Sequence, residues 1–386
     1  MQCIKKYFIA VVFIQILYVC HANSQWISDS LVEHHIQKGI DYVYNLSFDS
    51  AITEFNFAVR LQPEHPVGYF FLAMVEWWKI MIDIENESND KNFISMLDHV
   101  IDMCDKRLEK NENDIVGLFF KGGSLGFQGR LYGNREDWLK AANCGREALP
   151  IVQQAFQLAP ENYDILLGIG IYNYYAAVIP EIYPWVKPLM IFFPKGDKIT
   201  GLTQLRSAAE HARYANIEAT YFLMQVYQYY ERHYSEALRY AEYLHGRFPN
   251  NAMFHKYVGR CNAGIGNWHE VKNIFNEILN RVNKKQPGYD LLAEREAFYY
   301  LGLAEMGHRK LDSALSYLYR SDELSRMLDK KGNSGFMIMT NLKIGMIYDM
   351  QGKRDLAIMQ YNKVLDMKNS WDAHKQAKKY LKSPYK

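Results

Sequence analysis

Apolar residues recur three or four positions apart along most of this 386-residue chain, with polar residues between them. In the segment 93–109, for example, Ile94, Leu97, Ile101 and Leu108 follow this spacing. A helix turns once every 3.6 residues, so such a pattern places one apolar stripe along it, whereas a strand needs strict alternation. No strand-like alternation of any length competes with the helical spacing. The pattern therefore predicts an all-α protein.

The expected helices come in pairs joined by polar or proline-containing turns. A long apolar helix is followed by the polar run ENESNDKN and by an amphipathic helix, and Pro160 ends a later pair. In the first half of the chain we expect helices over 67–84, 93–109, 114–130, 137–158, 162–178 and 198–214.

Small, aromatic and proline residues follow one another at fixed intervals from residue 32 onward. Glycine and alanine suit a place where two helices cross closely, aromatic rings fill the space beside the crossing, and proline ends the second helix. This order resembles a tetratricopeptide repeat, whose conserved positions are matched by Gly39, Tyr42, Ala51, Phe55, Ala58 and Pro63.

The same intervals return in the second half of the chain. Gly345 with Tyr361 and Gly302 with Leu318 repeat the order, and Gly259 gives a weaker copy. Several matches at one period predict stacked repeats. We expect a right-handed α-solenoid of about eight helix pairs of tetratricopeptide type, closed by a capping helix over 370–382.

Irregular helix pairs are expected over 25–215 and a more regular array over 216–386. Between them lies a proline-rich insert, 179–197, in place of a short turn. The longest uncharged run before it, Ile165 to Pro180, is shorter than the roughly 18 residues of a membrane span, so we expect a loop. The loop either folds back on the repeats, or contacts a partner or a membrane through Trp185, Phe192 and Phe193.

The N-terminal residues have the pattern of a signal peptide, 1–24. Two lysines, Lys5 and Lys6, precede an apolar run, and small residues follow at Ala22 and Ser24. We therefore expect an exported protein that is periplasmic, in the cell envelope or secreted. A lipid-modified Cys20 and an uncleaved N-terminal anchor are the alternatives.

The charges and cysteines give no sign of a cofactor or a nucleic-acid partner. The 45 basic and 43 acidic residues are spread along the chain and leave a net charge of +2, whereas nucleic-acid binders carry a basic patch. Three cysteines remain beyond the signal segment, Cys104, Cys144 and Cys261, with neither disulfide nor zinc spacing. We expect no metal, no cofactor, no nucleic acid and no small-molecule substrate.

One short sequence, GGSLG at 122–126, has the spacing of a hydrolase nucleophile motif with Ser124 as the nucleophile. That motif needs a strand before the serine, and the flanking residues here are typical of a helix. The glycines then serve to bring neighbouring helices together. We expect no enzyme, with a Ser124 hydrolase as a distant alternative.

Repeat solenoids bind partners along a concave face formed by the first helix of each pair. The repeat register places aromatic, apolar and basic residues there: Tyr229, Tyr230, Lys256, Arg260, Tyr299 and Met306. Lys256 and Arg260 lie one helical turn apart and resemble part of a clamp for a peptide carboxylate. The alternative is pairing within the protein, with a glutamate such as Glu242 or Glu294.

A narrower resemblance covers residues 164–261. The runs LLGIGIYNYYAAVIP, FFPKGDKITGLTQLRSAAEHA and RFPNNAMFHKYVGRC resemble the core of the inclusion-body-clearance and tetratricopeptide-repeat-protein-thirty-nine family. The resemblance implies a helical-repeat adaptor without enzymatic activity. The signal peptide is a departure from that family and implies another compartment.

Together these features predict an exported scaffold that binds a protein or an extended peptide in its concave groove. The alternative is a membrane- or lipid-associated adaptor that uses the apolar segment 182–193 of the insert.

Overall fold

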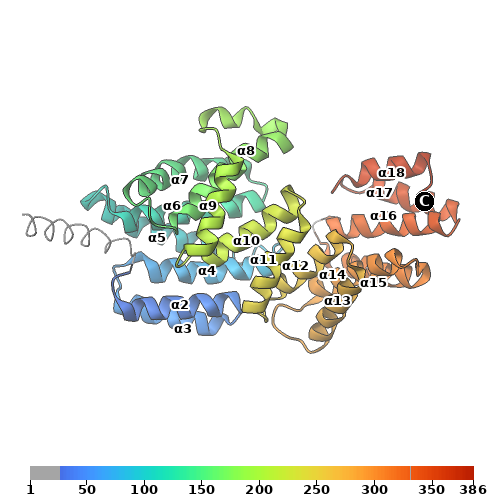
Figure 1. The fold of residues 1–386 in the computed structure, drawn as a ribbon, viewed down its shortest axis with the longest axis horizontal. Coiled ribbons are helices and arrows are strands. Elements are labelled where there is room, and N and C mark those ends of the chain that lie inside the picture. The colour runs from blue at the N-terminus through green and yellow to red at the C-terminus, as the bar shows by residue number, and fades with distance from the viewer. Residues whose placement is uncertain (1–26, 331) are drawn as a thin grey trace, which may run out of the picture. The chain divides into compact units, whose positions relative to one another are not determined.

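The computed structural model describes residues 27–330 and 332–386, without the side chains of Leu189 and Phe192. Every regular element in this part of the chain is helical (Figure 1). Helices α2 to α17 form eight consecutive pairs, and α18 follows the last of them. The expected all-α solenoid is confirmed. The signal segment, 1–24, lies outside the described residues.

The chain divides into two compact units, the first ending at Phe222 and the second beginning at Leu223. The first unit contains α2 (Ser30–Tyr44), α3 (Phe48–Leu61), α4 (Pro66–Ile82), α5 (Asp90–Lys110), α6 (Ile115–Asn134), α7 (Trp138–Leu158), α8 (Ile165–Ile182), η1 (Pro184–Val186), η2 (Leu189–Phe192), α9 (Lys198–His211) and the start of α10 (Asn216–Gln225). The second contains the end of α10, η3 (Val226–Tyr230), α11 (Tyr234–Arg247), α12 (Ala252–Ile265), α13 (Trp268–Asn283), α14 (Leu291–Gly307), α15 (Leu311–Leu328), α16 (Gly335–Met350), α17 (Arg354–Leu365) and α18 (Ala373–Lys382).

The two helices of a pair cross where a glycine of the first helix meets a large side chain of the second. The large residue follows its glycine by sixteen positions in four pairs. A Cβ atom placed on any of these glycines would collide with the facing side chain, so only glycine permits the crossing. The contacts join Gly39 to Phe55, Gly259 to Phe275, Gly302 to Leu318 and Gly345 to Tyr361. This register, predicted from the sequence, makes the pairs tetratricopeptide-like.

The proline-rich insert separates two helices that still pack as a pair. A Cβ atom on Gly201 of α9 would lie 2.5 Å from the backbone nitrogen of Tyr174 in α8, so the two backbones are in close contact. Asn173 donates a hydrogen bond of 2.8 Å to Gln204 across the same interface. The insert is thus accommodated without loss of the pair.

Helix α8 continues past the expected residue 178 and ends at Ile182, with Pro180 inside its last turn. By length and composition alone it is long and apolar enough to cross a membrane, and about a third of it is buried in the fold. The expectation that this segment is too short for a span is therefore corrected. Its packing on α9 is that of a helix pair.

The start of α10 returns to the first helix of unit 1. The Arg213 guanidinium forms an ion pair with Glu33 of α2, and the Gln37 side chain donates to the Arg213 carbonyl. Farther along, Glu218 accepts hydrogen bonds from Tyr44 of α2, at 3.1 Å, and from Arg130 of α6, at 2.5 Å. Residues 213–222 therefore cover side chains of α2 and α6.

Arg130 lies between aromatic rings in this closure. Its guanidinium carbon is 4.8 Å from the ring centre of Trp77 in α4 and 4.5 Å from that of Phe222. Cation–π contacts of this kind are strongest where water is excluded. Three helices that are distant in sequence are thereby tied to one segment of α10.

We predict that Gly259→Ala destabilises unit 2 by about 1–3 kcal/mol, because the new Cβ atom would lie 2.5 Å from Cε2 of the Phe275 ring. The matched control is Gly246→Ala in α11, where nothing lies within 4 Å of the added atom. Alanine should leave stability unchanged there or raise it by about 0.5–1 kcal/mol. Urea unfolding followed by circular dichroism measures both. Equal effects of the two substitutions would contradict the crossing model.

Candidate binding surface

Three of the predicted groove residues lie together in unit 2. Arg260 of α12 donates a hydrogen bond of 3.0 Å to the Tyr229 hydroxyl in η3, and its guanidinium carbon lies 4.8 Å from the ring centre of Tyr257. Lys256 is one turn before Arg260 on the same helix. Tyr229 is 50% exposed and is the most accessible member of this group.

A buried glutamate joins the two cations. Arg260 forms a two-pronged pair with Glu296 of α14, with Nε to Oε1 at 2.5 Å and Nη2 to Oε2 at 2.7 Å. The Lys256 ammonium is 3.7 Å from the same Oε2 atom. Only 2% of the Glu296 side chain is exposed. The cations are thus paired within the protein, by Glu296 and not by Glu242 or Glu294.

The charges of this cluster, Lys256, Arg260 and Glu296, do not cancel. Burial tends to raise the pKa of Glu296, but Arg260 and Lys256 outweigh it and hold the carboxyl ionised with a lowered pKa. Burial lowers the pKa of the Lys256 ammonium, and Glu296 only partly opposes this. Two cations therefore share one carboxylate, which leaves an excess positive charge under Tyr229.

The segment that carries Tyr229 is a five-residue π-helix, η3. Its first three residues, Val226, Tyr227 and Gln228, are buried. π-Helical turns shift the following side chains relative to a regular helix and occur frequently at functional sites. Here the turn places Tyr229 at the surface, and Tyr230 beside it is half-buried.

The remaining predicted groove residues belong mainly to the hydrophobic core of unit 2. Tyr299 is 6% exposed, and its ring centre lies 5.5 Å from that of Phe336 in α16. Met306 is half-buried and packs on the same core cluster. These two residues therefore offer a partner less surface than the repeat register suggested.

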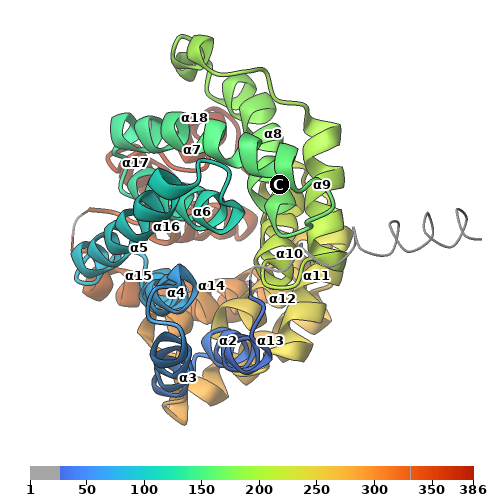
Figure 2. The same ribbon diagram turned by 90° about the vertical axis from the view of Figure 1, so that its left-hand side faces the viewer.

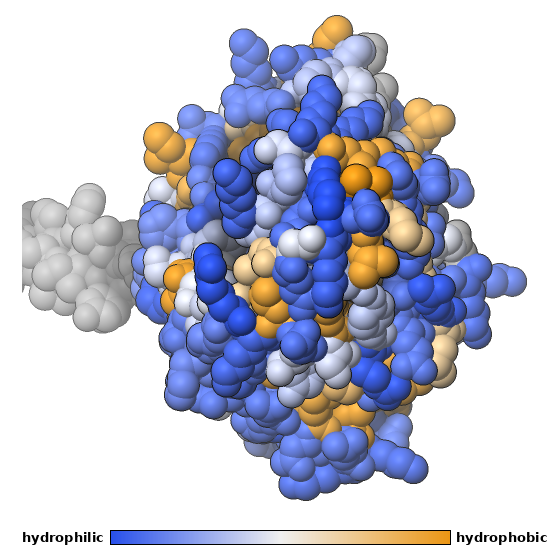
Figure 3. Space-filling model, turned by 90° about the vertical axis from the view of Figure 1, so that its right-hand side faces the viewer, coloured by the Kyte–Doolittle hydropathy of each residue, from blue (hydrophilic) through white to orange (hydrophobic). Residues whose placement is uncertain are grey.

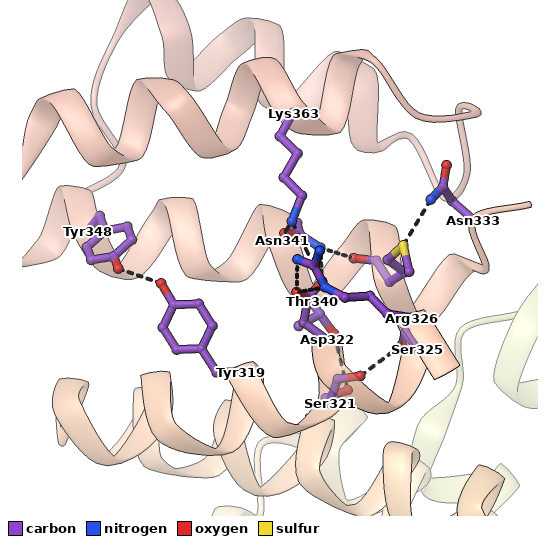
Figure 4. A network of polar contacts seen from close by, with 11 residues as sticks. Tyr319, Ser321, Asp322, Ser325, Arg326, Asn333, Thr340, Asn341, Tyr348 and Lys363 are labelled. Atoms are coloured by element: carbon purple, nitrogen blue, oxygen red, sulfur yellow. Dashed lines mark hydrogen bonds and ion pairs between the residues drawn. The ribbon is translucent and has the colours of Figure 1, made fainter. Parts of the chain in front are cut away.

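A polar network fixes the next helices of the array (Figure 4). Asn341 of α16 donates to Asp322 of α15 at 2.6 Å and accepts from Lys363 of α17 at 2.5 Å. Asp322 also accepts from Arg326 on its own helix. Buried polar groups that are bonded in this way specify one packing arrangement. The network aligns α15, α16 and α17 beyond the Arg260 cluster.

The face seen in Figure 3 has several separate apolar patches within a mainly hydrophilic surface. No single broad apolar surface dominates this view. Polar and aromatic contacts, such as those that Tyr229 and Arg260 provide, fit such a surface better than hydrophobic burial alone.

The second predicted surface, the insert, is half anchored and half exposed. Tyr172 donates a hydrogen bond to the Pro194 carbonyl, and Phe193 packs near Gly145 of α7. Trp185, by contrast, is 56% exposed. The Phe192 side chain lies outside the described part of the chain. The insert therefore folds back along its second half and presents its first half.

Ser124 lies in the middle of α6 and is fully buried. Its hydroxyl has no hydrogen-bond partner, and no strand precedes it within 115–134. A nucleophile elbow needs an exposed serine on a strand-to-helix turn, so the hydrolase alternative fails at this residue. The described residues also contain no group of three or more His, Cys, Asp or Glu side chains placed to hold a metal ion.

No family model and no curated protein matches the chain. Among solved structures, the chain is similar to a tetratricopeptide repeat protein from Parabacteroides merdae, at 13% identity and a TM-score of 0.34, with 81% of this chain and 99% of that chain covered. It is also similar to a human IFIT1 dimer with m7Gppp-AAAA, at 12% identity and a TM-score of 0.38, covering 94% and 87% of the two chains. The resemblance of 164–261 to the inclusion-body-clearance family stays a prediction, as does the absence of a nucleic-acid partner.

We predict that Arg260→Met lowers the free energy of unfolding by about 3–5 kcal/mol, because it leaves the Glu296 carboxylate buried without its main partner. The double variant Arg260→Met/Glu296→Met should recover most of that loss, since both charges are then gone. Denaturant unfolding of the three proteins measures the difference. A double variant that is as unstable as the single one would show that packing, not the ion pair, is what matters.

Proposed function

We propose that this protein is a non-enzymatic scaffold whose second unit binds an extended protein segment across α12 and α14, beside Tyr229. The repeated helix pairs support this, since arrays of this kind act through the extended surfaces that their first helices form. In unit 1, α10 covers side chains of the corresponding helices α2 and α6. The surface beside Tyr229 is therefore the better candidate.

One observation carries the proposal: Lys256 and Arg260 share the single carboxylate of Glu296 directly beneath an exposed tyrosine. A carboxylate of a bound segment would balance the excess charge and gain charge-assisted hydrogen bonds. Tyrosine and arginine are the residues most often found at the energetic centre of protein interfaces. We therefore infer an acidic side chain or a free C-terminus in the bound segment.

We predict that Tyr229→Ala weakens binding of peptides selected against this protein from a display library by about tenfold or more. The matched control is Tyr243→Ala in α11, which has a similar exposed fraction of 52% and lies outside the cluster. Lys256→Gln should weaken acidic peptides more than their amidated counterparts. Isothermal titration measures the affinities. Equal losses in the Tyr229 and Tyr243 variants would refute the assigned surface.

Export remains a separate proposal, supported by Lys5, Lys6 and the apolar run that follows them. The expected result is a secreted or periplasmic product whose first residue is Asn23 or Gln25, as N-terminal sequencing would show. Lys5→Glu/Lys6→Glu should retain the precursor inside the cell. A cytoplasmic product that still begins at Met1 would contradict the signal peptide.

A further inference from the structure

The insert and the start of α7 together expose an unusual group of large apolar side chains. We call it the insert tip and define it by Trp138, Leu139, Tyr183, Trp185 and Ile191. Their exposed fractions are 50%, 77%, 47%, 56% and 79%. The rings of Trp138 and Trp185 meet edge to face, with centroids 5.9 Å apart, so the two segments form one surface. Exposed apolar clusters of this kind mark interaction sites.

The exposure is fixed by the fold. The segment after α8 projects beyond the other helices of unit 1 in both ribbon views (Figures 1 and 2). Its return to α9 is anchored by the hydrogen bond from Tyr172 to the Pro194 carbonyl. A Cβ atom on Gly196 would lie 2.8 Å from the Ala176 Cβ atom, so this turn is in close contact with α8. The tip is held out by a packed base.

Basic side chains lie among these apolar ones. Lys187 and Lys195 belong to the insert, and no carboxylate of the described residues forms an ion pair with either. A lysine can bury its methylene stem along an apolar surface while its ammonium stays in a polar layer. Tryptophan and tyrosine favour the same boundary between hydrocarbon and water.

A projecting tip of this composition fits a lipid bilayer better than a folded partner. A protein partner would need a matching hollow for a protruding tryptophan, whereas a bilayer yields around it. Each lysine near an anionic membrane surface contributes about 1 kcal/mol of attraction. We propose that the insert tip docks on the surface of an anionic bilayer, with Trp185 and Ile191 entering the headgroup region. This goes beyond the peptide-binding surface of unit 2 and does not depend on it.

Flotation with vesicles tests the proposal, using protein that lacks residues 1–24 so that the apolar N-terminal run cannot itself insert. The protein should float with vesicles of phosphatidylcholine and phosphatidylglycerol, and much less with phosphatidylcholine alone. Trp185→Ser/Ile191→Ser should reduce the bound fraction about tenfold or more, as expected when two buried apolar side chains are lost. Lys187→Gln/Lys195→Gln should remove most of the preference for anionic lipid.

The matched control is Met327→Ser/Met359→Ser, which changes two exposed apolar residues of unit 2 that are 60% and 66% exposed. It should float like the unchanged protein, and circular dichroism should show that all variants are folded. Failure of the unchanged protein to float, or an equal loss in the control, would overturn the proposal. So would concentration-dependent self-association that disappears in Trp185→Ser/Ile191→Ser, since the tip would then bind a second copy of the chain.

Discussion

The close crossing of two helices at a glycine is the contact on which this architecture depends. Gly39, Gly259, Gly302 and Gly345 each face a large side chain sixteen residues later, and the missing Cβ atom makes room for it. A single pair of this kind cannot bury its apolar faces, so it must stack on the next one. The repeated crossing therefore explains both the helix pairs and their continuation along the chain.

Buried ion pairs tie together first helices that are distant in sequence. In unit 1, Arg130 pairs with Glu218, 88 residues away, and in unit 2 Arg260 pairs with Glu296, 36 residues away. Each arginine also lies against aromatic rings. Breaking such a pair leaves a buried charge, so each one favours a single arrangement of its helices. The difference lies in exposure: the Arg260 cluster has an accessible tyrosine above it.

The two proposed surfaces depend on different physical effects. Recognition beside Tyr229 rests on an excess of buried positive charge and therefore on the chemistry of the bound segment. The insert tip instead relies on apolar area that the fold leaves in water and on two lysines without acidic partners. A scaffold with both features would hold a protein segment close to a membrane surface.

The sequence by itself determined the all-α class, the eight helix pairs and the glycine crossings, because helical periodicity and the sixteen-residue interval are local properties of the chain. It also brought Tyr229, Lys256 and Arg260 forward as neighbours. Only the tertiary structure decided that Glu296 is their acidic partner, that Tyr299 is buried and that Trp138 joins Trp185. These outcomes depend on how helices of different pairs are rotated against one another, and packing between distant segments sets that rotation.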